Sequence, residues 1–301
     1  MISLDEFLQL PVKEVAQLVR ASGPKVVVFP INGTRRWFML EYGDRKFDDP
    51  IAAYTDIVIK RHIELYKLFF DHGIDTLVTP AIGPEVLDTR DDYMEKIGAE
   101  GLASIAKHQS FLSFYDEHEI RVRFYGEYRK ALSETTYAYI VNLFDNLTQT
   151  TLNNNRFRLF FGVFADDRKA DEAIAKSAID YFRNKGEVPG RQNIVESYYG
   201  EYVEKADIFI GFDRFAVFDY PLLRWGGEDL YFTIAPSLYM TDRQLRLILY
   251  DHLYTRRVNE PDYLSLEHTA LKELKSYYKA NQDIVLGTGK LSSNIWLPAN
   301  S

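Results

Sequence analysis

A loop of small residues followed by two arginines is the segment of this chain that could most directly do chemistry. The apolar run Val26–Ile31 leads into the loop Asn32–Thr34 and then into Arg35 and Arg36. Backbone N–H groups of such a turn, with forked guanidinium groups beside them, can bind an anion such as a diphosphate from several sides. The same pair could instead form solvated ion pairs of little consequence. Both interpretations stay open at this point.

A second loop with an arginine follows a later apolar run. Asp213 and Arg214 come directly after the run Asp207–Phe212. Ligands of open α/β sheets bind at the carboxyl ends of the strands, and these ends meet at one edge of a parallel sheet. We therefore expect both arginine-bearing loops on the same rim, an arrangement that favours anion binding.

Short apolar runs with many β-branched and aromatic residues predict the strands that would position these loops. The predicted strands are Val26–Ile31, Thr76–Pro80, Arg121–Tyr125, Arg158–Phe164, Asp207–Phe212 and Leu230–Ile234. The segments between them have helical spacing. Strands that alternate with helices predict an α/β fold with a mainly parallel, six-stranded sheet flanked by helices.

Two of the expected helices carry start signals. One opens at Asp48-Asp49-Pro50 and stops at Gly73, with proline placed early. The other opens at Thr241, three residues before Gln244, which is the spacing of a capping box. We find no repeat, low-complexity linker or break in composition, so residues 1–301 are expected to form a single domain.

Composition excludes several classes of function. The chain has 301 residues, 46% of them apolar, and a formal charge of −8. An acidic chain does not suit a broad nucleic-acid surface, although a local basic pocket can still bind a small anion. Without cysteine, there is no disulfide framework, thiolate nucleophile or cysteine-based zinc site. The N-terminus lacks a signal peptide and no window could span a bilayer, so a cytoplasmic protein without a transmembrane segment is expected.

Familiar catalytic and metal motifs are missing from the sequence. It contains no dinucleotide-binding glycine pattern, no nucleophile elbow and no metalloprotease spacing of histidines. The acidic pairs Asp48-Asp49, Asp91-Asp92 and Asp166-Asp167 could bind magnesium, but acidic pairs also favour helix starts. The residues alone therefore identify no metal ligands.

Aromatic residues provide a second indication of function, since the chain has 21 Tyr and 20 Phe. Most aromatic side chains serve the core. Several tyrosines nevertheless fall near expected loops, among them Tyr93, Tyr198 and Tyr199. Aromatic faces can stabilise a cation, and a phenol can orient water. A substrate with an anionic head and a long apolar body would use both the arginine rim and an aromatic cavity.

Taken together, these residues resemble the cis-prenyltransferases, the family with the undecaprenyl diphosphate synthase fold. The segments that carry this resemblance are Pro30–Trp37, Asp207–Arg214 and Asp229–Thr233. A closer likeness is to a divergent branch with the tuberculosinol (tuberculosinyl-adenosine) synthases and the kolavelool synthases. That likeness is carried by Phe114–Val122, Phe161–Phe164, Tyr198–Tyr202 and Ala235–Thr241, and it spans nearly the whole chain.

The resemblance implies a homodimer with a hydrophobic tunnel and an enzyme that acts on a bicyclic C20 prenyl diphosphate, such as kolavenyl or tuberculosinyl diphosphate. Such enzymes ionise the allylic carbon–oxygen bond and release diphosphate. The expectation at this stage is capture of the cation by water, giving a diterpene alcohol similar to kolavelool. Prenyl transfer to a small nucleophile such as adenosine is an alternative, and a non-catalytic prenyl-diphosphate-binding partner is another.

The resemblance also implies roles for individual residues. Arg35 and Arg36 would contact the diphosphate, with backbone donors from Gly33 and Thr34. Tyr54 and Tyr93 match positions at which the relatives use tyrosines near the reacting carbon. Further residues expected in the substrate site are Trp37, Tyr198, Tyr199, Asp213 and Arg214.

One residue departs from the pattern of the family. The family loop begins Asp-Gly, and its aspartate helps to place Mg²⁺ against the diphosphate, whereas this chain has Asn32. An amide oxygen can ligate magnesium weakly but brings no charge. We expect Mg²⁺ to be held mostly by diphosphate oxygens and other carboxylates, or to be less strictly required. Chain elongation is not expected.

Overall fold

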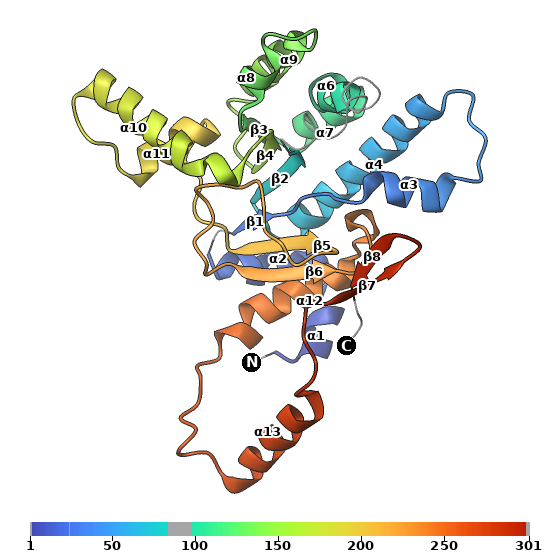
Figure 1. Cartoon of the computed structure of the whole chain (residues 1–301), viewed down its shortest axis with the longest axis vertical. Helices are drawn as coiled ribbons and strands as arrows, with labels where there is room; N and C mark the ends of the chain where they lie inside the picture. The colour runs from blue at the N-terminus through green and yellow to red at the C-terminus, as the bar shows by residue number, and fades with distance from the viewer. Residues whose placement is uncertain (1, 24, 84–97, 299–301) are drawn as a thin grey trace.

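The computed structural model describes residues 2–23, 25–83 and 98–298. Its body is built on a six-stranded sheet with strand order β3-β4-β2-β1-β5-β6 (Figure 1). Each neighbouring pair in this sheet is parallel. The strands are β1 (Val26–Val28), β2 (Thr76–Ile82), β3 (Ile120–Tyr125), β4 (Phe157–Val163), β5 (Ile208–Phe212) and β6 (Asp229–Thr233). The predicted α/β fold with a parallel sheet is confirmed.

Helices surround the sheet and connect its strands. The α-helices of the body are α1 (Leu4–Gln9), α2 (Val12–Ala21), α3 (Thr34–Tyr42), α4 (Pro50–Asp71), α6 (Ala99–Lys107), α7 (Gln109–Glu117), α8 (Tyr128–Leu132), α9 (Ala138–Thr150), α10 (Ala170–Lys185), α11 (Arg191–Tyr199) and α12 (Asp242–Leu253). Short 3₁₀ turns are η2 (Asp167–Lys169), η3 (Ser237–Tyr239) and η4 (Thr255–Arg257).

The strand predictions agree closely with the observed strands. The largest difference is in β1, which was expected to reach Ile31 but ends at Val28. Phe29 still donates a backbone hydrogen bond to Val78 (2.8 Å). Pro30 then has no N–H to donate, so the ladder stops and the chain leaves the sheet.

Both predicted helix starts are also present. Asp49 is the N-cap of α4, and its carboxylate accepts from the backbone N–H groups of Ile51 and Ala52, both at 3.0 Å. Asp49 therefore caps the start of a helix, which is the alternative to magnesium binding given for the pair Asp48-Asp49. Thr241 and Gln244 form the expected capping box at α12.

The two faces of the sheet contribute to separate hydrophobic cores. On β1, Val27 belongs to the larger core, whereas Val26 and Val28 belong to the smaller one. This alternation follows from the pleat, which directs successive side chains to opposite faces. The larger core includes α4, α7 and α9, and the smaller core is covered by α11 and by residues 217–223. Helices therefore cover both faces, as a parallel sheet requires.

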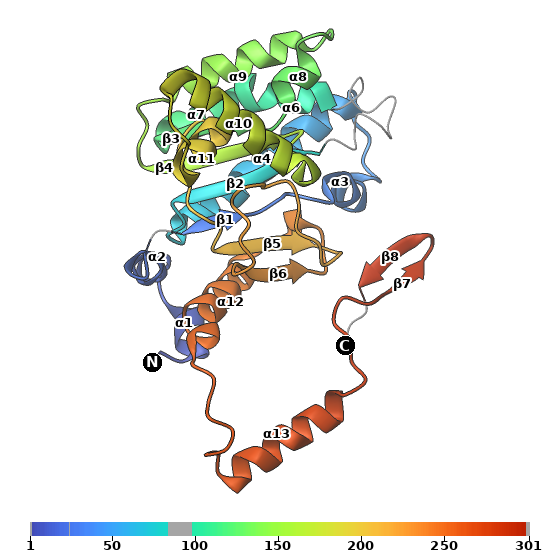
Figure 2. The same cartoon turned by 60° about the vertical axis from the view of Figure 1, so that its left-hand side comes forward.

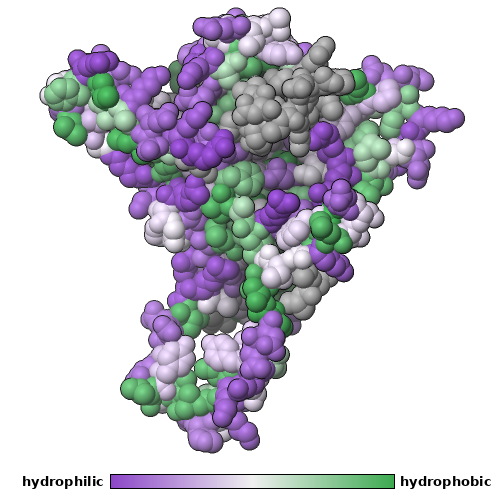
Figure 3. Space-filling view, viewed as in Figure 1, coloured by the Kyte–Doolittle hydropathy of each residue, from purple (hydrophilic) through white to green (hydrophobic). Residues whose placement is uncertain are grey.

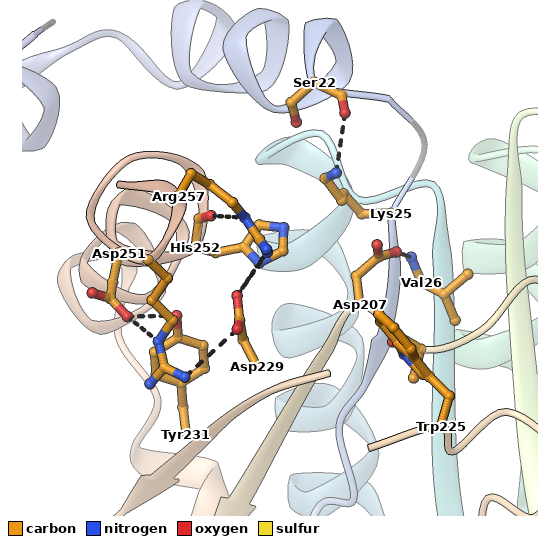
Figure 4. Close-up of polar contacts among 12 residues, drawn as sticks. Ser22, Lys25, Val26, Asp207, Trp225, Asp229, Tyr231, Asp251, His252 and Arg257 are labelled. Carbon is orange, nitrogen blue, oxygen red and sulfur yellow. Dashed lines mark hydrogen bonds and ion pairs between the residues drawn. The ribbon is translucent and has the colours of Figure 1, made fainter. Parts of the chain in front are cut away.

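A polar network ties α12 to the amino end of β6 (Figure 4). Asp229 accepts a hydrogen bond from Arg257 (2.9 Å) and lies 2.7 Å from Nδ1 of His252. Desolvation lowers the pKa of the buried His252, with Arg257 acting in the same direction and Asp229 against it. This network lies at the edge opposite to the carboxyl ends of the strands, so it supports the frame of the fold rather than the arginine rim.

Residues 258–298 form an extension, here called the C-terminal arm, which leads away from the body (Figure 2). The arm contains α13 (His268–Asn281), which buries no residue, and a hairpin of β7 (Gly289–Ser292) and β8 (Ile295–Pro298). Hydrophobic side chains lie exposed on it among hydrophilic ones (Figure 3). In the described part of the chain, no helix combines the length and apolarity that crossing a membrane requires.

Candidate functional site

The two arginine-bearing segments meet at one cavity, here called the rim cavity, with a volume of about 720 Å³. Arg35 and Arg36 were expected on a loop but lie in the first turn of α3, and Arg214 lies on the loop after β5. Its walls come from the loop after β1, the end of β2 and the loop after β5, with Tyr54 of α4 at one side. Both loops follow the carboxyl ends of adjacent parallel strands. The rim cavity contains the predicted residues Asn32, Gly33, Thr34, Arg35, Arg36, Tyr54, Asp213 and Arg214.

A buried serine from a distant part of the chain holds the Asn32 loop in place. Ser237 of η3 donates through Oγ to the carbonyl of Pro30 (3.2 Å). Its Oγ accepts from the backbone N–H of Asn32 (3.1 Å), and its own N–H donates to the carbonyl of Asn32 (3.1 Å). Ser237 lies in a segment that carries the resemblance, but sequence analysis gave it no role, because hydroxyl contacts across 205 residues leave no local signal.

Helix α4 supports this serine from the other side. Arg61 donates to the carbonyls of Leu238 (2.8 Å) and Met240 (2.9 Å), so it fixes η3 against α4. Charge-assisted hydrogen bonds of this kind are stronger than neutral ones. The Asn32 loop is thus held by a chain of contacts that reaches across the body.

Gly33 permits the sharp turn from the loop into α3. It is the N-cap residue of α3 and has a φ of +77°, which disfavours residues with a side chain. A Cβ at this position would lie 2.9 Å from Cε1 of Phe212 and 3.0 Å from Cβ of Pro236. The close approach of three segments places the N-terminus of α3 at the rim cavity, where N–H groups without intrahelical partners favour anions.

Arg36 links the first turn of α3 to the loop after β5. Its Nη1 lies 3.4 Å from Oδ2 of Asp213, and its guanidinium carbon lies 5.2 Å from the ring centroid of Phe212. The Arg36 side chain is 39% exposed, whereas the Asp213 side chain is 14% exposed. The guanidinium is therefore accessible from the cavity while its partner is largely covered.

Arg214 connects the rim cavity with the C-terminal arm. Its guanidinium carbon lies 5.8 Å from the ring centroid of Trp296 on β8. The cavity is thus lined by three arginines, with Arg35 and Arg36 in the first turn of α3 and Arg214 on the loop after β5. This concentration of positive charge lies in a chain whose net charge is −8.

A second, apolar cavity adjoins the rim cavity. It lies between α4, α6 and the end of β2, has a volume of about 140 Å³ and shares Ile31, Thr34 and Tyr54 with the rim cavity. Tyr54 therefore stands where the polar cavity meets the apolar one. Its ring contacts Phe38 edge to face, with centroids 5.1 Å apart.

The apolar cavity is also lined by His62, a histidine to which sequence analysis gave no role. Burial, reinforced by the charge of Arg61, lowers the pKa of His62 to about 4. Its Nε2 atom is buried and has no hydrogen-bond partner among the described residues. Burial likewise raises the pKa of Tyr66, which lines the same cavity. At neutral pH the cavity therefore presents an uncharged imidazole and an uncharged phenol.

Ligand cavities for small molecules usually exceed about 300 Å³. The apolar cavity of about 140 Å³ is smaller and would have to widen to hold a C20 ring system. The predicted hydrophobic tunnel stays a prediction.

Comparison with known proteins identifies the relatives of the chain. The tuberculosinyl adenosine transferase of Mycobacterium tuberculosis is 46% identical over 298 residues, which cover 98% of each chain. The chain belongs to the tuberculosinyl adenosine transferase family. The (+)-kolavelool synthase of Herpetosiphon aurantiacus is 27% identical over 306 residues, covering 99% of this chain and 96% of that protein. No model of a known protein family matches the sequence.

Solved structures confirm that this member of the tuberculosinyl adenosine transferase family has the cis-prenyltransferase fold. A probable undecaprenyl diphosphate synthase from Campylobacter jejuni superposes with a TM-score of 0.55 at 13% identity, covering 79% of this chain and 97% of that one. Lavandulyl diphosphate synthase from Lavandula x intermedia gives 0.55 at 14% identity, covering 82% and 98%. At these identities the likeness concerns the fold alone.

Other predicted residues of this family member lie elsewhere. Trp37 is buried, with its ring edge to face against Tyr42 at 5.6 Å, and does not line the rim cavity. Tyr199 belongs to the smaller core on the other face of the sheet, where its hydroxyl donates to the carbonyl of Pro221. Tyr198 contacts the same core. Tyr93 lies outside the described residues.

The structure does not bring Tyr198 and Tyr199 to either cavity, because they lie on the other face of the sheet. They end α11, which covers the smaller core, whereas α4 and the apolar cavity lie over the larger one. A tyrosine cluster in sequence does not reveal which face its helix will cover.

The described residues contain no group of three or more His, Asp or Glu side chains that could hold a metal by themselves. Asp166 accepts hydrogen bonds from its neighbour Arg168 (2.8 and 3.0 Å), so it serves a local turn. The pair Asp91-Asp92 lies outside the described residues. Asp213, which lines the rim cavity, nevertheless has a buried Oδ1 atom without a hydrogen-bond partner among the described residues. Such an oxygen fits Mg²⁺ if substrate oxygens complete the coordination.

Proposed function

We propose that this protein ionises the allylic diphosphate of a bicyclic C20 prenyl diphosphate and transfers the resulting diterpenyl cation to a nucleophile. The observation that carries this proposal is the rim cavity, in which two arginines at the N-terminus of α3 and one from the loop after β5 converge beside an apolar cavity. A substrate with a charged head and an apolar body matches this pair of cavities. Membership in a family of prenyl-group enzymes supports the same assignment.

In this proposal, Arg35 and Arg36 stabilise the negative charge that develops on the departing diphosphate. Preorganised donors of this kind contribute the largest share of catalysis in many enzymes. The backbone N–H groups near Gly33 and Thr34 add dipoles with the same polarity. Mg²⁺, when bound, would neutralise part of the diphosphate charge.

Tyr54 would lie beside the reacting carbon, because it stands where the two cavities meet. Its aromatic face can stabilise a nearby cation. The neutral His62 and Tyr66 further inside the apolar cavity would avoid repelling that cation. Tyr93 remains a proposed second tyrosine on the strength of the resemblance alone.

We propose adenosine as the first candidate nucleophile. The 46% identity with a tuberculosinyl adenosine transferase over nearly the full length supports this choice. Water, which sequence analysis favoured, is the second candidate, supported by the 27% identity with a kolavelool synthase. The arginines of the rim cavity act on the diphosphate in both reactions, so they do not distinguish adenosine from water.

Product analysis tests the proposal. The purified protein is incubated with tuberculosinyl, kolavenyl and linear geranylgeranyl diphosphates, with and without adenosine, and products are analysed by mass spectrometry. We expect diphosphate release and, with adenosine present, a diterpenyl-adenosine conjugate from a bicyclic substrate. An alcohol alone in both conditions supports water as the nucleophile. Absence of diphosphate release from every substrate would contradict the enzymatic assignment and favour a binding protein.

A further inference from the structure

Asp213 presents a carboxylate oxygen that the protein leaves unused. Its Oδ2 lies 3.4 Å from Nη1 of Arg36, but its Oδ1 is buried and has no hydrogen-bond partner among the described residues. Its side chain is only 14% exposed. A buried polar atom without a partner destabilises the folded protein, and the destabilisation is larger for a charged group. A cation bound to Oδ1 of Asp213 would give this oxygen the partner that it lacks.

The backbone also holds Asp213 in an unusual conformation. Its φ is +70°, in the left-handed region that few residues other than glycine adopt. Its N–H donates to the carbonyl of Thr233 at 3.0 Å, which ties the residue to the end of β6. The loop therefore fixes where the carboxylate lies.

Asn32 and Asp213 follow neighbouring strands. Val28, the last residue of β1, pairs with Phe209 of β5, and Asn32 and Asp213 come four residues after these two along the chain. Both residues line the rim cavity. The contact that a Cβ of Gly33 would make with Phe212, at 2.9 Å, shows how closely the two loops approach. An amide and a carboxylate are thus presented to one cavity from neighbouring loops.

A cation beside Asp213 would reduce the repulsion between its carboxylate and a bound diphosphate. The proposed function places a diphosphate beside the arginines, and a carboxylate oxygen next to a diphosphate is repelled unless a positive charge lies between them. Of the two carboxylate oxygens of Asp213, Oδ2 lies near Arg36, whereas Oδ1 has no hydrogen-bond partner among the described residues. Mg²⁺ prefers hard oxygen ligands and is commonly held by one or two carboxylates together with substrate phosphates and waters.

We infer that Asp213 is the carboxylate that holds Mg²⁺ against the diphosphate in this chain, with the amide oxygen of Asn32 as a weaker neighbour. Asp213 then supplies, from the loop after β5, the charge that Asn32 cannot supply from the loop after β1. This inference rests on the proposed function and adds a specific residue to it.

Binding of inorganic diphosphate to the full-length protein tests the inference without relying on turnover. Isothermal titration calorimetry is carried out in EDTA and in Mg²⁺. For the unchanged protein we expect Mg²⁺ to tighten diphosphate binding at least tenfold. For Asp213→Asn we expect the enhancement by Mg²⁺ to fall below about twofold, with metal-free binding unchanged or tighter because the repulsion is gone.

Two further variants complete the design. Asp219→Asn is the matched control, because Asp219 lines the same cavity and also has a positive φ, +61°. In this variant we expect Mg²⁺ to tighten diphosphate binding tenfold, as in the unchanged protein. In the double variant Asn32→Asp/Asp213→Asn, a carboxylate returns on the opposite loop, and we expect the enhancement to return. Asparagine tolerates a positive φ at least as well as aspartate, so Asp213→Asn should fold, as thermal unfolding will verify.

A tenfold enhancement retained in Asp213→Asn would overturn the inference while leaving the proposed function intact. An unchanged protein whose diphosphate binding is indifferent to Mg²⁺ would also overturn it. An unchanged protein that binds no diphosphate would overturn both the inference and the proposed function.

Discussion

At the scale of single residues, the guanidinium group of Arg36 is expected to stabilise the departing diphosphate. We expect Arg36→Ala to lower the rate of diphosphate release at least a hundredfold, since one well-placed donor contributes about 3 kcal/mol to transition-state stabilisation. The melting temperature should change little, because the ion pair with Asp213 is partly exposed. Arg45→Ala is the control: Arg45 is exposed beyond α3 and stacks on Tyr42 at 4.7 Å. A near-normal rate in Arg36→Ala would remove Arg36 from the mechanism.

A second residue-scale prediction concerns His62 and acid stability. Its folded-state pKa of about 4 lies below the unfolded value of 6.5, so the native state resists protonation. The contribution of His62 to stability is therefore complete above pH 6.5 and is lost as the pH falls toward 4. From pH 7 to pH 5, this group alone should lower the free energy of unfolding by about 2 kcal/mol.

Urea unfolding at pH 7 and pH 5 measures this effect. His118 and His252 also have lowered pKa values, caused first by desolvation, so the unchanged protein should lose further stability. His62→Phe should lose about 2 kcal/mol less over the same interval. His268→Phe, at an exposed position on the arm, should behave as the unchanged protein does. Equal losses in all three proteins would show that His62 is not a buried neutral imidazole.

At the scale of elements, the close approach of the β1 and β5 loops depends on Gly33. Gly33→Ala meets both a positive φ and atoms at 2.9–3.0 Å, so we expect a loss of about 2–4 kcal/mol in unfolding free energy and weaker diphosphate binding. Gly23→Ala is a matched control, because Gly23 has a φ of +98° with nothing within 4 Å. It should cost only about 1 kcal/mol. If Gly33→Ala and Gly23→Ala lowered the free energy of unfolding equally, the close approach of Phe212 and Pro236 to Gly33 would be contradicted.

The elements could be predicted from sequence better than the contacts between them. Arg36 and Asp213 could be placed at the same rim from the sequence, because each follows an apolar strand and the carboxyl ends of parallel strands meet at one edge of the sheet. The position of Tyr199 could not be predicted, since its face depends on where α11 crosses the sheet. The support from Ser237 to Asn32 could not be predicted either, because it joins residues far apart in sequence. The apolar cavity depends on packing between α4 and α6, which the periodicity of each helix leaves undetermined.

At the scale of the whole molecule, the homodimer stays a prediction from the resemblance. The arm buries none of the residues of α13 and exposes Tyr277, Tyr278 and Leu286. Short helices are marginal in water without tertiary packing. Sedimentation should therefore give a mass of about 70 kDa, twice the 35.0 kDa of one chain. A single species at the monomer mass across micromolar concentrations would contradict the dimer.

The rim cavity is proposed to bind the diphosphate of a prenyl substrate. A crystal structure with inorganic diphosphate and Mg²⁺ would show where diphosphate binds. We expect diphosphate oxygens within hydrogen-bond distance of Arg35 and Arg36 and at the N-terminus of α3, with the Tyr54 ring toward the apolar cavity. Diphosphate bound elsewhere, with both guanidinium groups turned to solvent, would contradict it.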